Sequence, residues 1–294
     1  MAERDKNGRI TMSNIFSIAK KEFADLVGEP GILLVLIVYV VLIVGSVVYI
    51  YDNLKLGMIY DSAGLAKSML SSISSILGVY GSVIALMIGF ASIANEKLNN
   101  ALNTIITKPL YRDTIINGKL LGCICFLTCL FGLAIALYIS FSLIIIGGIT
   151  INAIPLFLEK LPVVFIISLI YVIFFLSFSM LFCLAIKSNG VALMLTILLF
   201  LLLTNIIPTV SFAGNLSVVF RDGGAQLFEQ MMGVILFFNP NGVFVTVVGD
   251  YINYSSSNVF IGINDVLPGF IKLFLITIIL IILTYTIFMR RDIA

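Results

Sequence analysis

Three cysteines come nearest to a reactive site in this chain. Cys123, Cys125 and Cys129 fall within one apolar run, at a spacing that a thiolate ligand set or a redox pair could use. The chain contains no His, and no carboxylate lies close to these cysteines in the sequence. We therefore interpret them, together with Cys183, as small residues that let helices pack closely in lipid. We predict no metal site and no disulfide framework.

Other kinds of catalysis lack their residues. The absence of His excludes His-based zinc sites and His general bases. The long apolar runs contain no Asp or Glu, which excludes intramembrane aspartyl proteases and the mid-depth carboxylates of ion-coupled transporters. A phosphate-binding loop of the type G-x-x-x-x-G-K-[ST] is also missing. A membrane-embedded enzyme would have to use Glu229, Asp250 or Asp265, which we interpret as solvated loop charges, so we predict no catalytic residue.

The composition is that of an integral membrane protein. Of 294 residues, 61% are hydrophobic and 11% are charged, more apolar surface than a soluble protein can bury. A helix needs about 20 apolar residues to cross the hydrocarbon core, and the alternation typical of barrel strands is absent. We predict a single all-α domain over residues 1–294, with six transmembrane helices at 31–51, 73–93, 120–146, 163–186, 191–210 and 269–289.

The distribution of Lys and Arg predicts the orientation. With both termini in the cytoplasm, the inner segments carry 12 of these residues and the outer segments carry 5. The positive-inside rule favours this arrangement. Because the basic residues lie at membrane edges, the net charge of +2 does not indicate a nucleic-acid partner.

The segments between the spans have distinct patterns. Residues 13–28 predict an amphipathic helix on the inner membrane surface. A short loop is expected at 152–162, and a tight inner turn at 187–190. The long outer segment, 211–268, predicts two short apolar helices separated at Asn239-Pro240, with residues 225–250 either re-entrant or lying on the outer surface.

A cationic segment, 95–113, connects the second and third spans. Its residues Leu98, Leu102, Ile105 and Ile106 have the i, i+4, i+7, i+8 spacing of one helix face, and Pro109 ends that helix. An interfacial connector with positive-inside charges is one interpretation. The alternative is a docking surface, because a transporter with no visible energy source of its own needs a partner on the inside.

Four groups of residues resemble the membrane-spanning permease subunits of type 2 ABC transporters. The first is Glu96-Lys97, followed by the Leu/Ile-rich helix, Lys108-Pro109, Arg112 and 118–122 (Gly-Lys-Leu-Leu-Gly). The others are the leader 18–23, which includes Lys20, Lys21, Glu22 and Phe23; the Asn239-Pro240 pair; and the basic C-terminal run 288–293. Asn99-Asn100 departs from the Gly-Thr-like pair of many relatives.

This resemblance implies a six-helix permease that works as a dimer, with a second copy or a paralogue, in the plasma membrane of a prokaryote. A cytoplasmic ABC ATPase subunit would bind ATP and Mg²⁺, so no cofactor is expected on this chain. The segment 95–113 would be the coupling helix that contacts the ATPase, with the leader as the interfacial helix. The expected coupling residues are Glu96, Lys97, Leu98, Leu102, Ile105, Ile106, Lys108, Pro109 and Arg112.

Two functions follow from these observations. The first is an ATP-driven transporter, with export favoured by the resemblance. Phe, Tyr and Met in the spans, without buried charge, favour an amphipathic or lipid-like cargo. The second is a membrane scaffold or assembly factor that uses the same inner surface without ATP-dependent flux.

Overall fold

A computed structural model describes residues 12–29, 31–59, 61–98, 112–206, 239–253 and 259–290. Throughout these ranges the secondary structure is helical, and no strand occurs in them. The prediction of an all-α membrane protein is therefore confirmed. The helices are α1 (Met12–Gly28), α2 (Gly31–Lys55), α3 (Ser62–Ser75), η1 (Ile76–Tyr80), α4 (Gly81–Leu98), α6 (Arg112–Ile145), α7 (Gly148–Ala185), α8 (Asn189–Leu201), η3 (Leu202–Ile206), α11 (Pro240–Asn253) and α12 (Val259–Arg290).

Five helices are long and apolar enough to cross a membrane. They include the predicted first, second, third, fourth and sixth spans. The predicted fifth span, 191–210, coincides with the apolar helix Asn189–Thr204, which is shorter than the other five. The six-span count thus remains a prediction. The crossing segments are Leu34–Lys55, Ser62–Asn95, Thr114–Ile145, Gly148–Ala185 and Val266–Met289.

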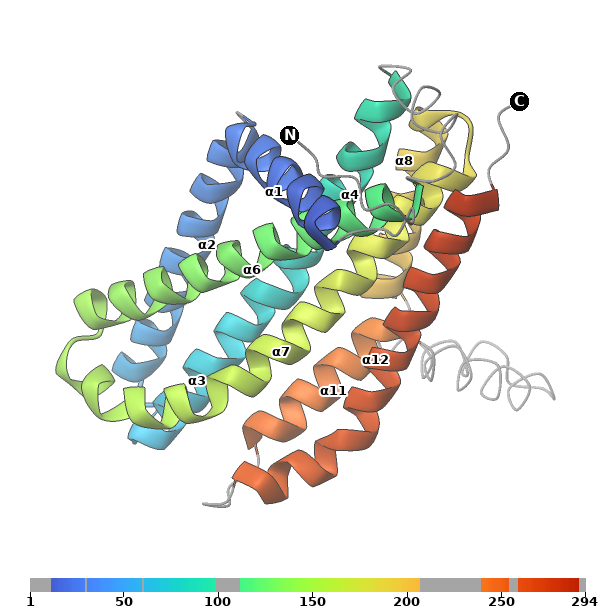
Figure 1. Cartoon of the computed structure of the whole chain (residues 1–294). Helices are drawn as coiled ribbons and strands as arrows, with labels where there is room; N and C mark the ends of the chain where they lie inside the picture. Colours follow the sequence, from blue (N-terminus) through green and yellow to red (C-terminus); the bar gives the residue numbers. More distant parts are fainter. Residues whose placement is uncertain are drawn as a thin grey trace, which may run out of the picture.

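The predicted loop at 152–162 is wrong. α7 is one helix of 38 residues that contains both Pro155 and Pro162. The connection from α6 is only two residues long, and it turns through Gly147 with a positive φ of 78°. Proline weakens a helix without ending it where neighbouring helices hold the segment. The first turns of α7 run across one end of the bundle before the helix enters it (Figure 1).

Other boundaries also differ from the prediction. α6 begins at Arg112, and the helix that contains the second span begins at Ser62. α12 begins at Val259 and continues through Pro268, so its first turns lie within the predicted outer segment 211–268. In each case polar or proline-containing turns extend an apolar helix, because a helix satisfies its backbone groups wherever it leaves the hydrocarbon core.

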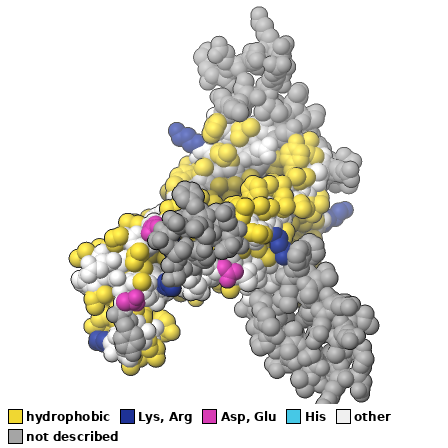
Figure 2. All heavy atoms as spheres, turned by 90° about the horizontal axis from the view of Figure 1, so that it is seen from below, with side chains coloured by type: hydrophobic (Ala, Val, Ile, Leu, Met, Phe, Trp, Pro, Cys, Tyr) yellow, Lys and Arg dark blue, Asp and Glu magenta, His cyan; other side chains and the backbone are white. Residues whose placement is uncertain are grey.

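The helix starts and ends gather at two ends of the bundle. The α1 end, at the top of Figure 1, holds the start of α2 and the ends of α4 and α12. The far end holds the end of α2 and the start of α3. Seen from the far end, the described surface is mostly apolar with few charged side chains (Figure 2). Such a surface suits a lipid environment.

α7 forms the centre of the bundle. It contacts α3, α4, α6, α8, α11 and α12. Its ring of Tyr171 stacks on Phe244 of α11, with centroids 4.3 Å apart, and meets Phe175 edge-on. Bulky aromatic side chains thus fill the space between the central helix and its neighbours.

α11 packs one side against α12, α7 and α3, while Val245 on its other side is 56% exposed. Asn239 caps the helix, because its Oδ1 accepts a hydrogen bond from the N–H of Asn241 at 3.1 Å, and Pro240 occupies the first helical position. The Asn241 side chain accepts from the Tyr171 hydroxyl at 2.9 Å and donates to the Thr204 carbonyl at 3.2 Å. These bonds fix the start of α11 against α7 and η3. Residues 211–238 of the predicted outer segment lie outside the described residues, so the choice between a re-entrant and a surface position for 225–250 stays open.

Candidate functional site

Two glycines of α6 form a seat for α1. A Cβ added at Gly118 would lie 2.7 Å from Cγ2 of Ile18, and one added at Gly122 would lie 2.8 Å from the carbonyl oxygen of Ala19. The pair has the G-x-x-x-G spacing that lets two helices approach closely in a membrane. α1 therefore packs directly on the first turns of the third span. The G-x-x-x-G spacing is visible in the sequence and was a usable signal for this packing.

A buried ion pair also connects α1 to α6. Nζ of Lys119 lies 2.7 Å from Oε2 of Glu22, and the two side chains are 8% and 12% exposed. The hydroxyl of Ser92 on α4 donates to Oε1 of Glu22 at 2.7 Å. The other oxygen of the carboxylate is thus also satisfied, as a buried charge requires. We call Glu22, Ser92 and Lys119 the polar joint, since they connect α1, α4 and α6.

A second polar contact joins α4 to the end of α7. The ammonium of Lys97 donates to the carbonyl oxygens of Cys183 and Ile186, the latter at 2.9 Å. A cation at this position satisfies carbonyls left open by the last turn and opposes the negative end of the helix dipole. Lys97 thus attaches the last turn of α4 to the last turn of α7.

The two contacts stand on either side of the predicted coupling segment. Lys97 precedes residues 99–111, and Lys119 follows them by two turns of α6. The chain therefore leaves the bundle from a helix end fixed to α7 and returns into a helix fixed to α1. A displacement of the connecting segment would reach both helices through these contacts.

The predicted coupling residues fall into three groups. Glu96 and Leu98 lie in the last turn of α4, and Arg112 begins α6, but their side chains are outside the described part. The side chain of Lys97 is turned into the protein, so its influence on a partner would act through α7. The remaining predicted residues, Leu102, Ile105, Ile106, Lys108 and Pro109, lie outside the described residues.

The predicted interfacial helix has one exposed basic side and one packed side. Lys20 and Lys21 are exposed, as expected for a helix that faces water or lipid head groups. Phe23 packs edge-on against Phe126 of α6, with ring centroids 6.2 Å apart. Glu22 faces inward into the polar joint. That the helix lies on the membrane surface remains a prediction.

The site offers mechanical connection rather than bond chemistry. Among the described residues, no group of three or more His, Cys, Asp or Glu could hold a metal ion. Cys125 and Cys129 are exposed on α6, whereas Cys123 is buried. The charged side chains of the site, Glu22 and Lys119, instead hold α1, α4 and α6 together through Ser92.

A family model described as ABC-2 family transporter protein matches residues 16–293. The chain belongs to this family. The predicted resemblance of the chain to type 2 ABC permeases is therefore confirmed. No curated protein matches the chain. As an ABC-2 transporter protein, it is the transmembrane component of an ABC transporter and not itself the ATPase.

Proposed function

We propose that this ABC-2 protein is the permease of an ATP-driven exporter that couples to a separate cytoplasmic ATPase. ATP and Mg²⁺ would be bound by that ATPase, and a second permease copy or a paralogue would complete the transmembrane path. The observation that carries the proposal is the attachment on both sides of residues 99–111, through Lys97 on one side and the polar joint on the other.

The coupling mechanism follows from these attachments. Closure of the ATPase on ATP would displace the segment between α4 and α6. Because Lys97 binds the end of α7, that displacement would pull on the central helix of the bundle. Because Lys119 binds Glu22, α1 would move with α6 as one unit. Packed helices transmit such rigid-body motion, whereas a slack loop would absorb it.

The charge distribution supports a cytoplasmic position for the α1 end. Lys20, Lys21 and Lys187 are exposed there, in agreement with the positive-inside rule. In this orientation both termini and residues 99–111 face the cytoplasm, where an ATPase could reach them. The proposed location is the plasma membrane of a prokaryote.

The test uses the full chain coexpressed with its ATPase subunit and reconstituted in lipid. The double variant Ile105→Asp/Ile106→Asp should remain folded but lose both copurification with the ATPase and permease-dependent ATP hydrolysis. Lys187→Gln, which removes an exposed charge at the same end, is the matched control and should behave as wild type. A double variant with full permease-dependent hydrolysis would overturn the proposal. A wild-type complex without ATP-dependent flux would favour the scaffold alternative.

A further inference from the structure

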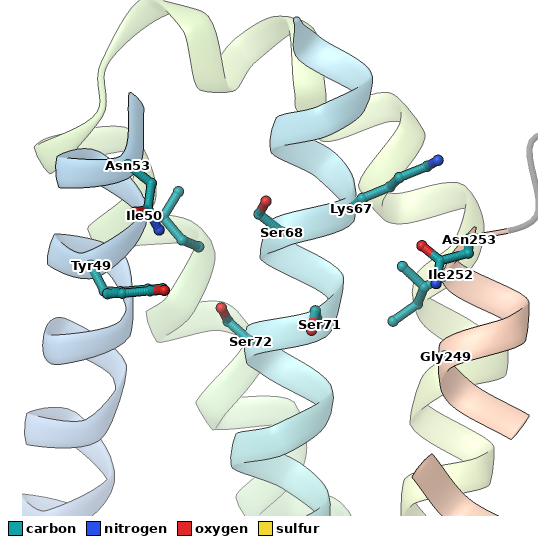
Figure 3. Close-up of a pocket in the computed structure, with 10 residues that line it drawn as sticks. All are labelled: Tyr49, Ile50, Asn53, Lys67, Ser68, Ser71, Ser72, Gly249, Ile252 and Asn253. Carbon is teal, nitrogen blue, oxygen red and sulfur yellow. The ribbon is translucent and has the colours of Figure 1, made fainter. Parts of the chain in front are cut away.

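A polar cavity of about 380 Å³ lies at the far end of the bundle from α1. α3 runs down its middle, with α2 on one side and α11 on the other (Figure 3). Its volume is in the range of sites for small molecules and head groups. The lining residues are Tyr49, Ile50, Asn53, Lys67, Ser68, Ser71, Ser72, Gly249, Ile252 and Asn253.

α3 has a polar face that its packing leaves unused. Leu65, Met69 and Ile73 are buried in the core of the bundle. On the other side, Lys67 and Ser71 line the cavity at the i, i+4 spacing of one helix face. Polar side chains within a span are costly unless they serve a partner or a water-filled space. The polar face therefore indicates a ligand rather than a packing role.

Several side chains that line the cavity have hydrogen-bond donors without an acceptor in the described part of the protein. Among the described residues, the ammonium of Lys67 forms no ion pair, and the hydroxyl of Ser71 forms no hydrogen bond. The carboxamides of Asn53 and Asn253 also face the cavity without a hydrogen-bond partner in that part of the chain. An ammonium with hydroxyl and amide donors is a suitable set for an oxyanion.

Lys67 carries the charge of the cavity wall. Among the described residues, no Asp or Glu lines the cavity. Asp61 is engaged as the N-cap of α3, with its Oδ1 accepting from the N–H of Gly64 at 2.9 Å. Lys160 of α7 donates to the Ile252 carbonyl at 3.1 Å, so its ammonium is already engaged beside the cavity.

The cavity is also bordered by apolar surface. Ile50 and Ile252 form buried apolar walls, at 1% and 5% exposure. On α2, Tyr49 at the rim is 67% exposed and its neighbour Val48 is 41% exposed. A ligand with a polar head in the cavity could thus lay an apolar tail along α2. The polar cavity and the apolar surface beside it therefore suit an amphipathic ligand.

We propose that this cavity binds a monoanionic phosphodiester head group, held by the Lys67 ammonium and the Ser71 hydroxyl. One ammonium matches a single negative charge, and the Ser71 hydroxyl can donate to one of the remaining phosphate oxygens, whereas the Ser68 hydroxyl already donates to the Gly64 carbonyl at 3.0 Å. The carboxamides of Asn53 and Asn253 would bind hydroxyls of the head group. The assignment of the bound head group to the transported cargo rests on the proposed transport function. Binding itself can be measured without ATP or the ATPase.

The experiment compares lipids retained by the full chain after extraction from nanodiscs of equal phosphatidylglycerol and phosphatidylcholine content. Native mass spectrometry of the wild-type chain should show preferential retention of phosphatidylglycerol. Lys67→Gln should reduce that preference on the order of tenfold, the loss of one charge-assisted contact, and Lys67→Arg should restore most of it. The matched control is Lys55→Gln, since Lys55 lies at the same end and stacks on Tyr51 outside the cavity.

A second arm distinguishes the source of the phosphodiester. Soluble glycerophosphoglycerol is titrated against the chain in neutral detergent. Saturable binding that depends on Lys67 would show that the head group alone suffices, and retention of lipid without such binding would show that the acyl chains contribute. Both results support the site. An unchanged lipid preference in Lys67→Gln, or an equal loss in Lys55→Gln, would overturn the proposal while leaving ATPase coupling untouched.

Discussion

Replacing Lys119 by Met should strongly destabilise the protein, because it breaks the buried ion pair with Glu22. Lys119 and Glu22 are 8% and 12% exposed, and their charged atoms lie 2.7 Å apart. Removing the ammonium leaves a buried carboxylate whose remaining side-chain partner is the Ser92 hydroxyl. Breaking a buried pair in this way costs about 3 kcal/mol, which is a factor on the order of one hundred in the unfolding equilibrium.

The double variant Glu22→Gln/Lys119→Met should recover most of that loss. The neutral amide keeps the shape of Glu22 and can still bind Ser92, so it should unfold within about 1 kcal/mol of wild type. The two substitutions are therefore expected to be strongly non-additive. Lys21→Met, an exposed cation on the same face of the membrane, should change stability by less than about 0.5 kcal/mol.

The assay is equilibrium unfolding of the purified full chain in mixed micelles, with the four variants of the mutant cycle measured side by side. A coupling energy above about 1.5 kcal/mol is expected, since the two residues contact each other directly. Additive effects, or a Lys119→Met variant as stable as Lys21→Met, would refute the reasoning. Either result would mean that the polar joint does not hold α1 against α6.

Three further changes test the other contacts. Gly122→Val should push α1 away from α6 and increase its protease cleavage, because a Cβ there would lie 2.8 Å from a backbone oxygen, whereas Gly132→Val has open space and should not. Asn241→Ala removes the bonds that hold α11 to its neighbours and should cost about 2 kcal/mol in the same unfolding assay. Lys97→Met removes the cap on the last carbonyls of α7; it should uncouple permease-dependent ATP hydrolysis while leaving assembly with the ATPase intact, and full coupling would contradict it.

The sequence predicted the features that follow from local patterns. Apolar runs located the crossing helices, and the Asn239-Pro240 pair marked the start of α11, because an Asn cap followed by Pro is itself a local signal. The loop at 152–162 was wrong for the same reason. Pro155 and Pro162 read locally as breaks, but packing inside a membrane bundle keeps the helix continuous.

The polar joint and the cavity could not be predicted in this way. Glu22, Ser92 and Lys119 are separated by up to 97 positions, so periodicity within a helix says nothing of their meeting. Lys67 and Ser71 precede the predicted second span at 73–93, and the cavity that they line forms only where α2 and α11 pack beside α3. The G-x-x-x-G spacing on α6 was visible, but its partner helix was not.

The π-helical turn η1 (Ile76–Tyr80) lies between α3 and α4, the two halves of the second span. A π turn corresponds to one extra residue in an α-helix, which leaves the flanking turns in register. Deleting one residue within 76–80 should therefore be tolerated. Deleting one between Ile84 and Phe90 should turn Ser92 and Lys97 by about 100° away from their partners, a shift of one helix position. The chain thus has one place where its second span can change length without changing its contacts.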